Sequence, residues 1–110
     1  MGYNEDLDLR IRDIVGRWPG RAAKKMFGGV CHLWRGHMVA GVHGDHLIVR
    51  LGPEGTARAL AEPHVRPFDL TGRPMKGWVM VHVAALGAPG ALEGWLARAR
   101  AFVETLPPKA

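Results

Sequence analysis

Apolar side chains recur along this chain with two different periods, and these periods predict its elements. Near the N-terminus, Leu7, Ile11 and Val15 follow one another at helical spacing, and Asn4 can serve as the N-cap of a helix that ends before Pro19-Gly20. Near the C-terminus, Pro89 opens a second helical pattern. Its apolar stripe consists of Leu92, Trp95, Leu96, Ala99, Phe102, Val103 and Leu106.

Between these helices, three runs of β-branched and apolar residues predict strands over residues 30–34, 38–43 and 46–51. Their links are short, since one is Arg35-Gly36-His37 and the other is Gly44-Asp45. A two-residue link with glycine first suits a type II′ hairpin turn. The pattern therefore predicts an antiparallel meander.

The remaining segments complete the predicted fold. Gly52-Pro53 opens another helix that Pro63 stops, residues 66–70 and 77–83 read as strands, and a further short strand fits residues 22–27. The predicted order is α-β-β-β-α-β-β-α. Amphipathic helices at both ends need a sheet face to cover, so we expect an α+β two-layer sandwich. Its antiparallel sheet would have about five strands with the helices on one face, in one domain over residues 1–110.

A set of short motifs punctuates this order. Met26, Phe27, Gly28 and Gly29 precede the meander, Pro67 and Phe68 follow it, and Met75 and Trp78 flank Lys76-Gly77 ahead of the last helix. Over residues 5–106 this arrangement resembles the N-terminal domain of the TfoX/Sxy competence regulators. The resemblance implies a secretion-chaperone-like fold and a non-enzymatic bacterial role linked to transcription and natural competence.

The chain also departs from that family. Members often carry tyrosine where Trp78 stands and lysine where Arg50 stands, and both replacements keep the general character. Full-length regulators continue into a C-terminal helical domain, whereas this sequence ends at Ala110. We therefore expect a stand-alone domain of this type.

Composition indicates a cytoplasmic protein. Hydrophobic residues make up 47% of the 110 residues, yet no apolar run approaches the roughly 20 residues that cross a bilayer. The acidic N-terminus, with Glu5, Asp6 and Asp8, is unlike a signal peptide. The single cysteine, Cys31, permits no internal disulfide and suits a reducing compartment.

The net charge of +5 is unevenly distributed. Residues 17–35 contain five cations and no acid, a pattern that could face nucleic acid, although no regular aromatic residues interleave them for base stacking. A set of cations adjoins the family motifs and forms a candidate patch for an acidic partner: Lys24, Lys25, Arg50, Arg73 and Lys76.

Two tryptophans, Trp34 and Trp78, lie on predicted strands. A tryptophan on the sheet face that carries no helices would be exposed and could anchor a second subunit. We therefore expect a homodimer with Trp34 and Trp78 as candidate contacts.

Catalytic, metal and cofactor sites are not indicated by the sequence. His43 and His46 flank a turn that holds Asp45, but no third ligand stands at a recognisable spacing. Cys31 and His32 alternate on a strand and cannot pair with each other, so Cys31 is expected to share a core face with Leu33. Gly28-Gly29 precedes a strand rather than a helix, unlike a phosphate loop, and is expected to form a β-bulge or a close-packing site.

The sequence thus favours a non-catalytic regulatory or protein-interaction domain. The alternative is a nucleic-acid-binding protein that uses residues 17–35, and the third hypothesis is a small metal-dependent enzyme.

Overall fold

The computed structural model describes residues 3–26, 29–69 and 75–107 of the chain. Within these ranges it has an α+β fold with three α-helices, six strands and one 3-10 helix. The elements are α1 (Glu5–Val15), β1 (Arg21–Met26), β2 (Gly29–Trp34), β3 (His37–His43), β4 (His46–Arg50), α2 (Gly52–Ala59), β5 (Val65–Pro67), β6 (Trp78–His82), η1 (Val83–Leu86) and α3 (Ala91–Val103). The predicted order is confirmed, with six strands in place of about five. The additional strand is β1.

The strands form one antiparallel sheet in the order β1-β2-β3-β4-β6-β5. The predicted meander is its centre. Both residues of the β2–β3 turn have left-handed backbone angles, with φ of 55° at Arg35 and 82° at Gly36. Such angles match the right-handed twist of paired strands, so the turn sets the register of the meander.

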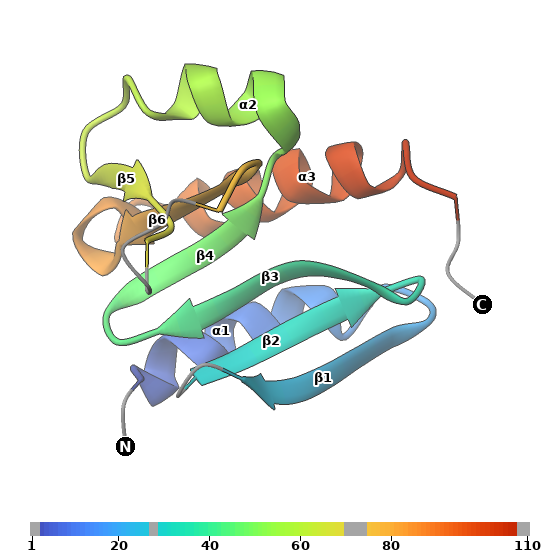
Figure 1. The fold of residues 1–110 in the computed structure, drawn as a ribbon. Coiled ribbons are helices and arrows are strands. Elements are labelled where there is room, and N and C mark those ends of the chain that lie inside the picture. The colour runs from blue at the N-terminus through green and yellow to red at the C-terminus, as the bar shows by residue number, and fades with distance from the viewer. Residues whose placement is uncertain (1–2, 27–28, 70–74, 108–110) are drawn as a thin grey trace.

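The sheet and two of the helices form two layers. Figure 1 shows α1 and α3 behind the sheet, so that one face is covered by helices and the other is turned toward the viewer. We call these the helix face and the open face. The predicted placement of the terminal helices on one side is confirmed.

The main core lies between the helix face and the helices. Asn4 caps α1, since its side-chain oxygen accepts a hydrogen bond of 3.0 Å from the Leu7 N–H. The helix then buries one side against the sheet. Core residues from the strands include Val30, Trp34, Val39, Val42, Leu47, Val49, Val79 and Val81, and those from the helices include Leu7, Ile11, Val15, Leu92, Leu96, Ala99 and Val103.

A smaller apolar cluster lies on the open face. It consists of Ile48, Phe68, Trp78 and Met80, with Met38 packed against it. Side chains alternate along a strand, so Ile48 and Met80 point away from the helix face that Leu47 and Val79 occupy. The open face is therefore partly covered by apolar groups rather than uniformly polar.

Several element boundaries differ from the predictions, most of them by one residue. The strand expected over residues 77–83 ends at His82, because His82 Nδ1 accepts a hydrogen bond from the Ala84 N–H and caps η1. The last helix begins at Ala91, after Gly90 with φ of 81°, rather than at Pro89. The strand expected over residues 66–70 is observed over Val65–Pro67, and residue 70 lies outside the described residues. In the described ranges no helix is long and apolar enough to cross a membrane.

Candidate functional site

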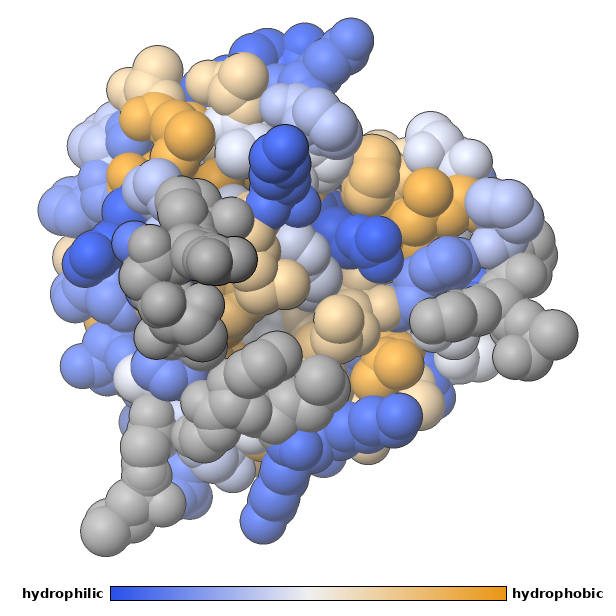
Figure 2. Space-filling model, viewed as in Figure 1, coloured by the Kyte–Doolittle hydropathy of each residue, from blue (hydrophilic) through white to orange (hydrophobic). Residues whose placement is uncertain are grey.

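A hollow of about 570 Å³ lies on the open face, at the end where β1, β2, β3, β4 and β6 approach the Arg35-Gly36 turn. We call it the cationic hollow. Its described lining residues are Lys24, Leu33, Gly36, His37, Met38, Arg50, Met75 and Trp78. Two of these are basic side chains, Lys24 and Arg50, and no acidic residue is among them. The space-filling view from this side shows apolar surface in the middle of the face, bordered by hydrophilic surface (Figure 2).

Strand register brings the cationic hollow together. Lys24 pairs with Cys31 across β1 and β2, Leu33 pairs with Met38, and Arg50 pairs with Trp78. Because β6 pairs with β4, Met75 and Trp78 of the second half of the chain meet residues of the first half at one end of the sheet. The hollow therefore joins two residues of the candidate patch, Lys24 and Arg50, across an apolar floor.

Arg50 is held in place by three neighbours. One terminal nitrogen donates a long hydrogen bond of 3.4 Å to the Met38 carbonyl. The guanidinium carbon lies 5.9 Å from the ring centre of Trp78 and 5.8 Å from that of Phe102. No carboxylate pairs with Arg50 in the part of the chain that the structure describes. Arg50 thus presents a positioned but uncompensated positive charge.

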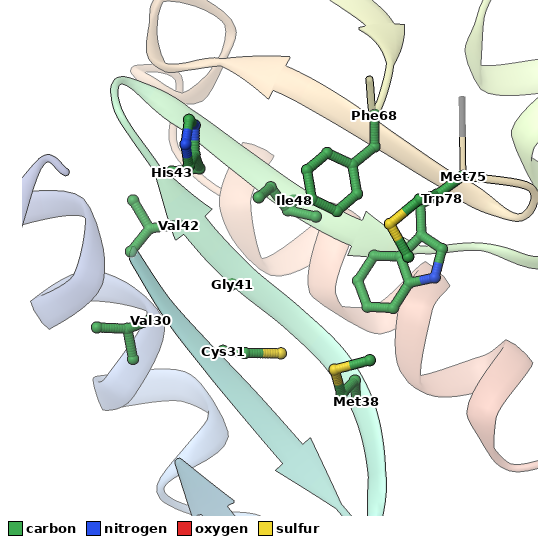
Figure 3. A pocket seen from close by; sticks show the side chains of 10 residues that line it. All are labelled: Val30, Cys31, Met38, Gly41, Val42, His43, Ile48, Phe68, Met75 and Trp78. Carbon is green, nitrogen blue, oxygen red and sulfur yellow. The ribbon is translucent and has the colours of Figure 1, made fainter. Parts of the chain in front are cut away.

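A smaller apolar pocket of about 20 Å³ continues from the cationic hollow and shares Met38, Met75 and Trp78 with it. Figure 3 shows the sulfur atoms of Cys31 and Met38 on one side, and Ile48, Phe68, Met75 and Trp78 on the other. Gly41, which lies on β3 like Met38, adds no side chain to the pocket. A volume of this size accommodates about one small group, such as a methyl.

Two of the other predicted cations, Lys25 and Lys76, do not line the hollow. Lys25 follows Lys24 on β1 and therefore lies on the opposite face of the strand, where it pairs with Val30 of the helix face. Lys76 is exposed but is not one of the lining residues. Arg73 lies outside the described residues.

The family-motif residues are partly brought together. Phe68, Met75 and Trp78 meet at the apolar pocket, while Pro67 lies on β5. Met26 ends β1, and Phe27 and Gly28 lie outside the described residues. Gly29 is a close-packing site, since a Cβ atom there would lie 2.0 Å from the Val42 carbonyl oxygen. This confirms the close-packing interpretation for Gly29.

The expected exposure of Trp34 and Trp78 is wrong. Trp34 is only 1% exposed, because it points to the helix face and donates its indole N–H to the Pro19 carbonyl at 3.0 Å. Trp78 does lie on the open face, but Phe68 and Arg50 leave it 6% exposed. Neither ring presents a free surface to a second subunit, so these two contacts no longer support the expected homodimer.

The structure contains a buried polar network that the sequence patterns did not predict. His32 is fully buried on the helix face, and its Nε2 lies 2.9 Å from Asp8 Oδ1. Arg12 Nε donates to the other Asp8 oxygen at 2.7 Å. Two signals could have indicated it: Asp8 stands three residues before Ile11 on the apolar stripe of α1, and His32 alternates with the core residues Val30 and Trp34.

Electrostatics fixes the protonation of this network. Burial lowers the pKa of His32, and the Asp8 carboxylate opposes that effect only in part, so the ring is neutral at pH 7. Burial also disfavours the charged form of Asp8, but hydrogen bonds from Arg12 and His32 outweigh it and lower the pKa of Asp8. The neutral ring therefore donates its Nε2–H to Asp8, and Nδ1 has no partner among the described residues.

The histidines at the far end of the sheet form a second polar cluster. His43 and His46 face each other across the turn as expected, and the rings of His46 and His82 lie 5.1 Å apart. Burial lowers the pKa of His46, and His82 and Arg66 add to this effect. His82 Nδ1 already accepts the Ala84 N–H. Among the described residues, no three histidine, cysteine or acidic side chains are arranged to hold a metal ion.

Cys31 lies on the open face with Leu33, rather than in the main core, but it is still buried. Burial raises the pKa of its thiol to about 11, and nearby Lys24 offsets this effect only in part. At pH 8 the thiolate fraction of the folded protein is then about 100-fold below that of an unperturbed cysteine near pKa 9.

We therefore expect iodoacetamide to alkylate Cys31 at least 100-fold more slowly in the native protein than in urea at pH 8. Mass spectrometry after timed quenching measures both rates. Equal rates would contradict the assignment of Cys31 as a packing residue.

Comparison with known proteins gives one result. A family model described as the TfoX N-terminal domain matches residues 13–103. This span includes every described residue of the cationic hollow and of the apolar pocket. Searches of curated proteins and of solved structures found no match.

Proposed function

The chain belongs to the TfoX N-terminal domain family, and on this basis we propose that it is a non-catalytic regulatory domain that binds a protein partner. The observation that carries this proposal is the cationic hollow. Arg50 is held there by Met38, Trp78 and Phe102, without a carboxylate partner in the described part of the chain. A fixed charge beside apolar side chains is suited to recognition.

The proposed absence of catalysis is supported by where the reactive groups lie. His32 is completely buried beneath α1, so no substrate reaches its ring. Neither His32 nor Asp8 lines the cationic hollow or the apolar pocket. The high pKa of Cys31, about 11, disfavours a thiolate nucleophile. The Asp8–His32 pair is better explained as a support for the helix–sheet interface.

The distribution of cations supports a protein partner over nucleic acid. The basic residues of segment 17–35 are divided between the two faces of β1, with Lys24 on one and Lys25 on the other. Arg35 and Arg100 both lie over Trp34, at 4.5 and 4.7 Å from its ring centre. That ring is buried, so it offers no surface on which a base could stack.

We also propose a cytoplasmic location, which the single unpaired thiol of Cys31 supports. The homodimer expected from the sequence stays a prediction.

An anisotropy titration with labelled single- and double-stranded DNA and RNA tests this proposal. Run at about 50 and 200 mM salt, it is expected to give flat curves at micromolar protein, because Lys24 and Lys25 of segment 17–35 lie on opposite faces of β1. Micromolar binding that weakens by orders of magnitude between the two salts would overturn the proposal and favour the nucleic-acid alternative. Poly-lysine, titrated in parallel, verifies that the probes respond.

A further inference from the structure

The cationic hollow has two kinds of surface side by side, and this combination restricts what it can bind. Lys24 and Arg50 supply charge, while Leu33, Met38 and Met75 supply apolar surface. No acid among the described lining residues neutralises the two cations. A ligand that matches both surfaces carries an anionic group and a large apolar group next to each other.

We propose that the cationic hollow binds an acidic peptide segment of a protein partner, with its carboxylates at Lys24 and Arg50 and a neighbouring leucine or phenylalanine on the floor. This proposal rests on the proposed function and specifies the chemistry of the partner. The volume of about 570 Å³ is sufficient for two or three side chains.

Arg50 is suited to be the anchor of such a segment. A free arginine loses much side-chain freedom when it binds, whereas Arg50 is already fixed by the Met38 carbonyl and the rings of Trp78 and Phe102. A guanidinium has five N–H donors, and only one contact with a protein acceptor is made in the described residues. The remaining donors are available to a carboxylate, which arginine can bind in a bidentate manner.

The apolar floor of the cationic hollow can accept apolar side chains of different shape. Met75 is 37% exposed, and Met38 and Leu33 are half-buried. Methionine adapts its three rotatable bonds to partners of different shape. The small apolar pocket behind Met38 and Met75 can receive a terminal methyl group.

A second copy of the chain fits this hollow less well. Glu5 and Asp6, the one adjacent pair of acids in the sequence, are exposed in the first turn of α1, on the helix side of the sheet and opposite to the hollow. A contact between these two surfaces would be head-to-tail and would not close into a dimer. Each copy also carries a net charge of +5, which disfavours association through a cationic surface.

NMR titration of the ¹⁵N-labelled protein with short peptides tests the proposal. The probe is acetyl-Gly-Asp-Leu-Phe-Glu-Gly-amide, at low salt. One matched peptide replaces the two acids with asparagine and glutamine, and another replaces leucine and phenylalanine with alanine. We expect the first peptide to shift the Trp78 indole N–H signal and the Met38 amide, and both matched peptides to bind at least tenfold more weakly. The Trp95 indole signal should remain unchanged, since Trp95 lies in the main core.

Two charge reversals on one strand provide the control. Lys24→Glu is expected to weaken peptide binding at least tenfold, which corresponds to about 1.4 kcal/mol. Lys25→Glu changes the net charge equally, but Lys25 lies on the opposite face of β1. Only a long-range electrostatic effect, which salt screens, should remain, so the affinity should change less than about threefold. Both residues are exposed, and both variants should fold.

The outcomes separate this proposal from the proposed function. Absence of binding at millimolar peptide, equal binding of the neutral peptide, or equal effects of Lys24→Glu and Lys25→Glu would each overturn the assignment of the hollow. None of these results bears on the nucleic-acid titration, so the proposed function would stand or fall on that titration alone. Steeply salt-dependent DNA binding that displaces the peptide would overturn both.

Discussion

Gly29→Ala is expected to lower the free energy of unfolding by about 3 kcal/mol, the upper end of the usual cost of overpacking. An alanine Cβ would lie 2.0 Å from the carbonyl oxygen of Val42 and 3.1 Å from its carbonyl carbon. These are backbone atoms of the neighbouring strand β3, so no side chain can rotate to make room. The strands β2 and β3 would have to separate at this end and lose part of their hydrogen-bonded pairing.

Gly94 provides the matched control for this substitution. It lies on the exposed side of α3, and a Cβ there meets nothing within 4 Å. Gly94→Ala should therefore stabilise the protein by about 0.5–1 kcal/mol, because alanine is the better helix former. Urea unfolding followed by tryptophan fluorescence measures both variants. A Gly29→Ala protein within 0.5 kcal/mol of the wild type would contradict the close approach of β2 and β3.

The sequence was sufficient to predict most of the fold, because its periodic segments are long and are bounded by proline and glycine. Asn4, Pro19 and the stripe from Leu92 to Val103 placed both terminal helices correctly. Short elements were harder. A strand of three residues such as Val65–Pro67 has no measurable period, and its pairing with β6 depends on contacts distant in sequence.

The candidate site was predicted only in part, because the sequence does not show which face of a strand each side chain occupies in the folded sheet. Lys24 and Lys25 are equivalent in sequence, yet only Lys24 lines the cationic hollow. Which face of β1 is the open one depends on where α1 and α3 pack, and the sequence of β1 alone does not indicate that packing. The same uncertainty led to the wrong expectation that Trp34 is exposed, since Trp34 points to the helix face.

The pairing of strands that are distant in sequence also had to come from the structure. Arg50 and Trp78 are distant in sequence but adjacent in register between β4 and β6. That pairing places a cation, an aromatic ring and the Met38 carbonyl in one contact group. The cationic hollow is therefore a property of the sheet order β3-β4-β6, in which a late strand lies beside an early one.

Asp8→Ala is expected to lower the free energy of unfolding by about 2–4 kcal/mol at pH 7. Removing the carboxylate leaves the Nε2–H of His32 without its acceptor in a fully buried position, where Nδ1 already has no described partner. The loss of the Arg12 contact adds little, because the Arg12 side chain is 44% exposed. Asp8→Asn, which keeps an oxygen for the His32 N–H, should lose clearly less. The control is Asp13→Ala, an exposed acid on the same helix, which should stay within about 0.5 kcal/mol of the wild type.

The pH dependence of this difference identifies the carboxylate as its source. Hydrogen bonds from Arg12 and His32 hold the pKa of Asp8 below its ordinary value of about 4 in the folded protein, against the effect of burial. A lowered pKa means that the unfolded chain binds the proton more readily, so the stabilisation by Asp8 is fully present above about pH 4 and is lost as the pH falls through the folded pKa. Urea unfolding curves at pH 7, 5 and 3 should therefore show the gap between the wild-type and Asp8→Ala proteins narrowing between pH 5 and pH 3, and not between pH 7 and pH 5. The lowered pKa of His32 reduces the stability of both proteins as the pH falls below about 6.5, and more so in Asp8→Ala, which lacks the carboxylate that raises the His32 pKa. A difference that stays constant from pH 7 to pH 3 would indicate lost packing instead of a lost charge-assisted hydrogen bond.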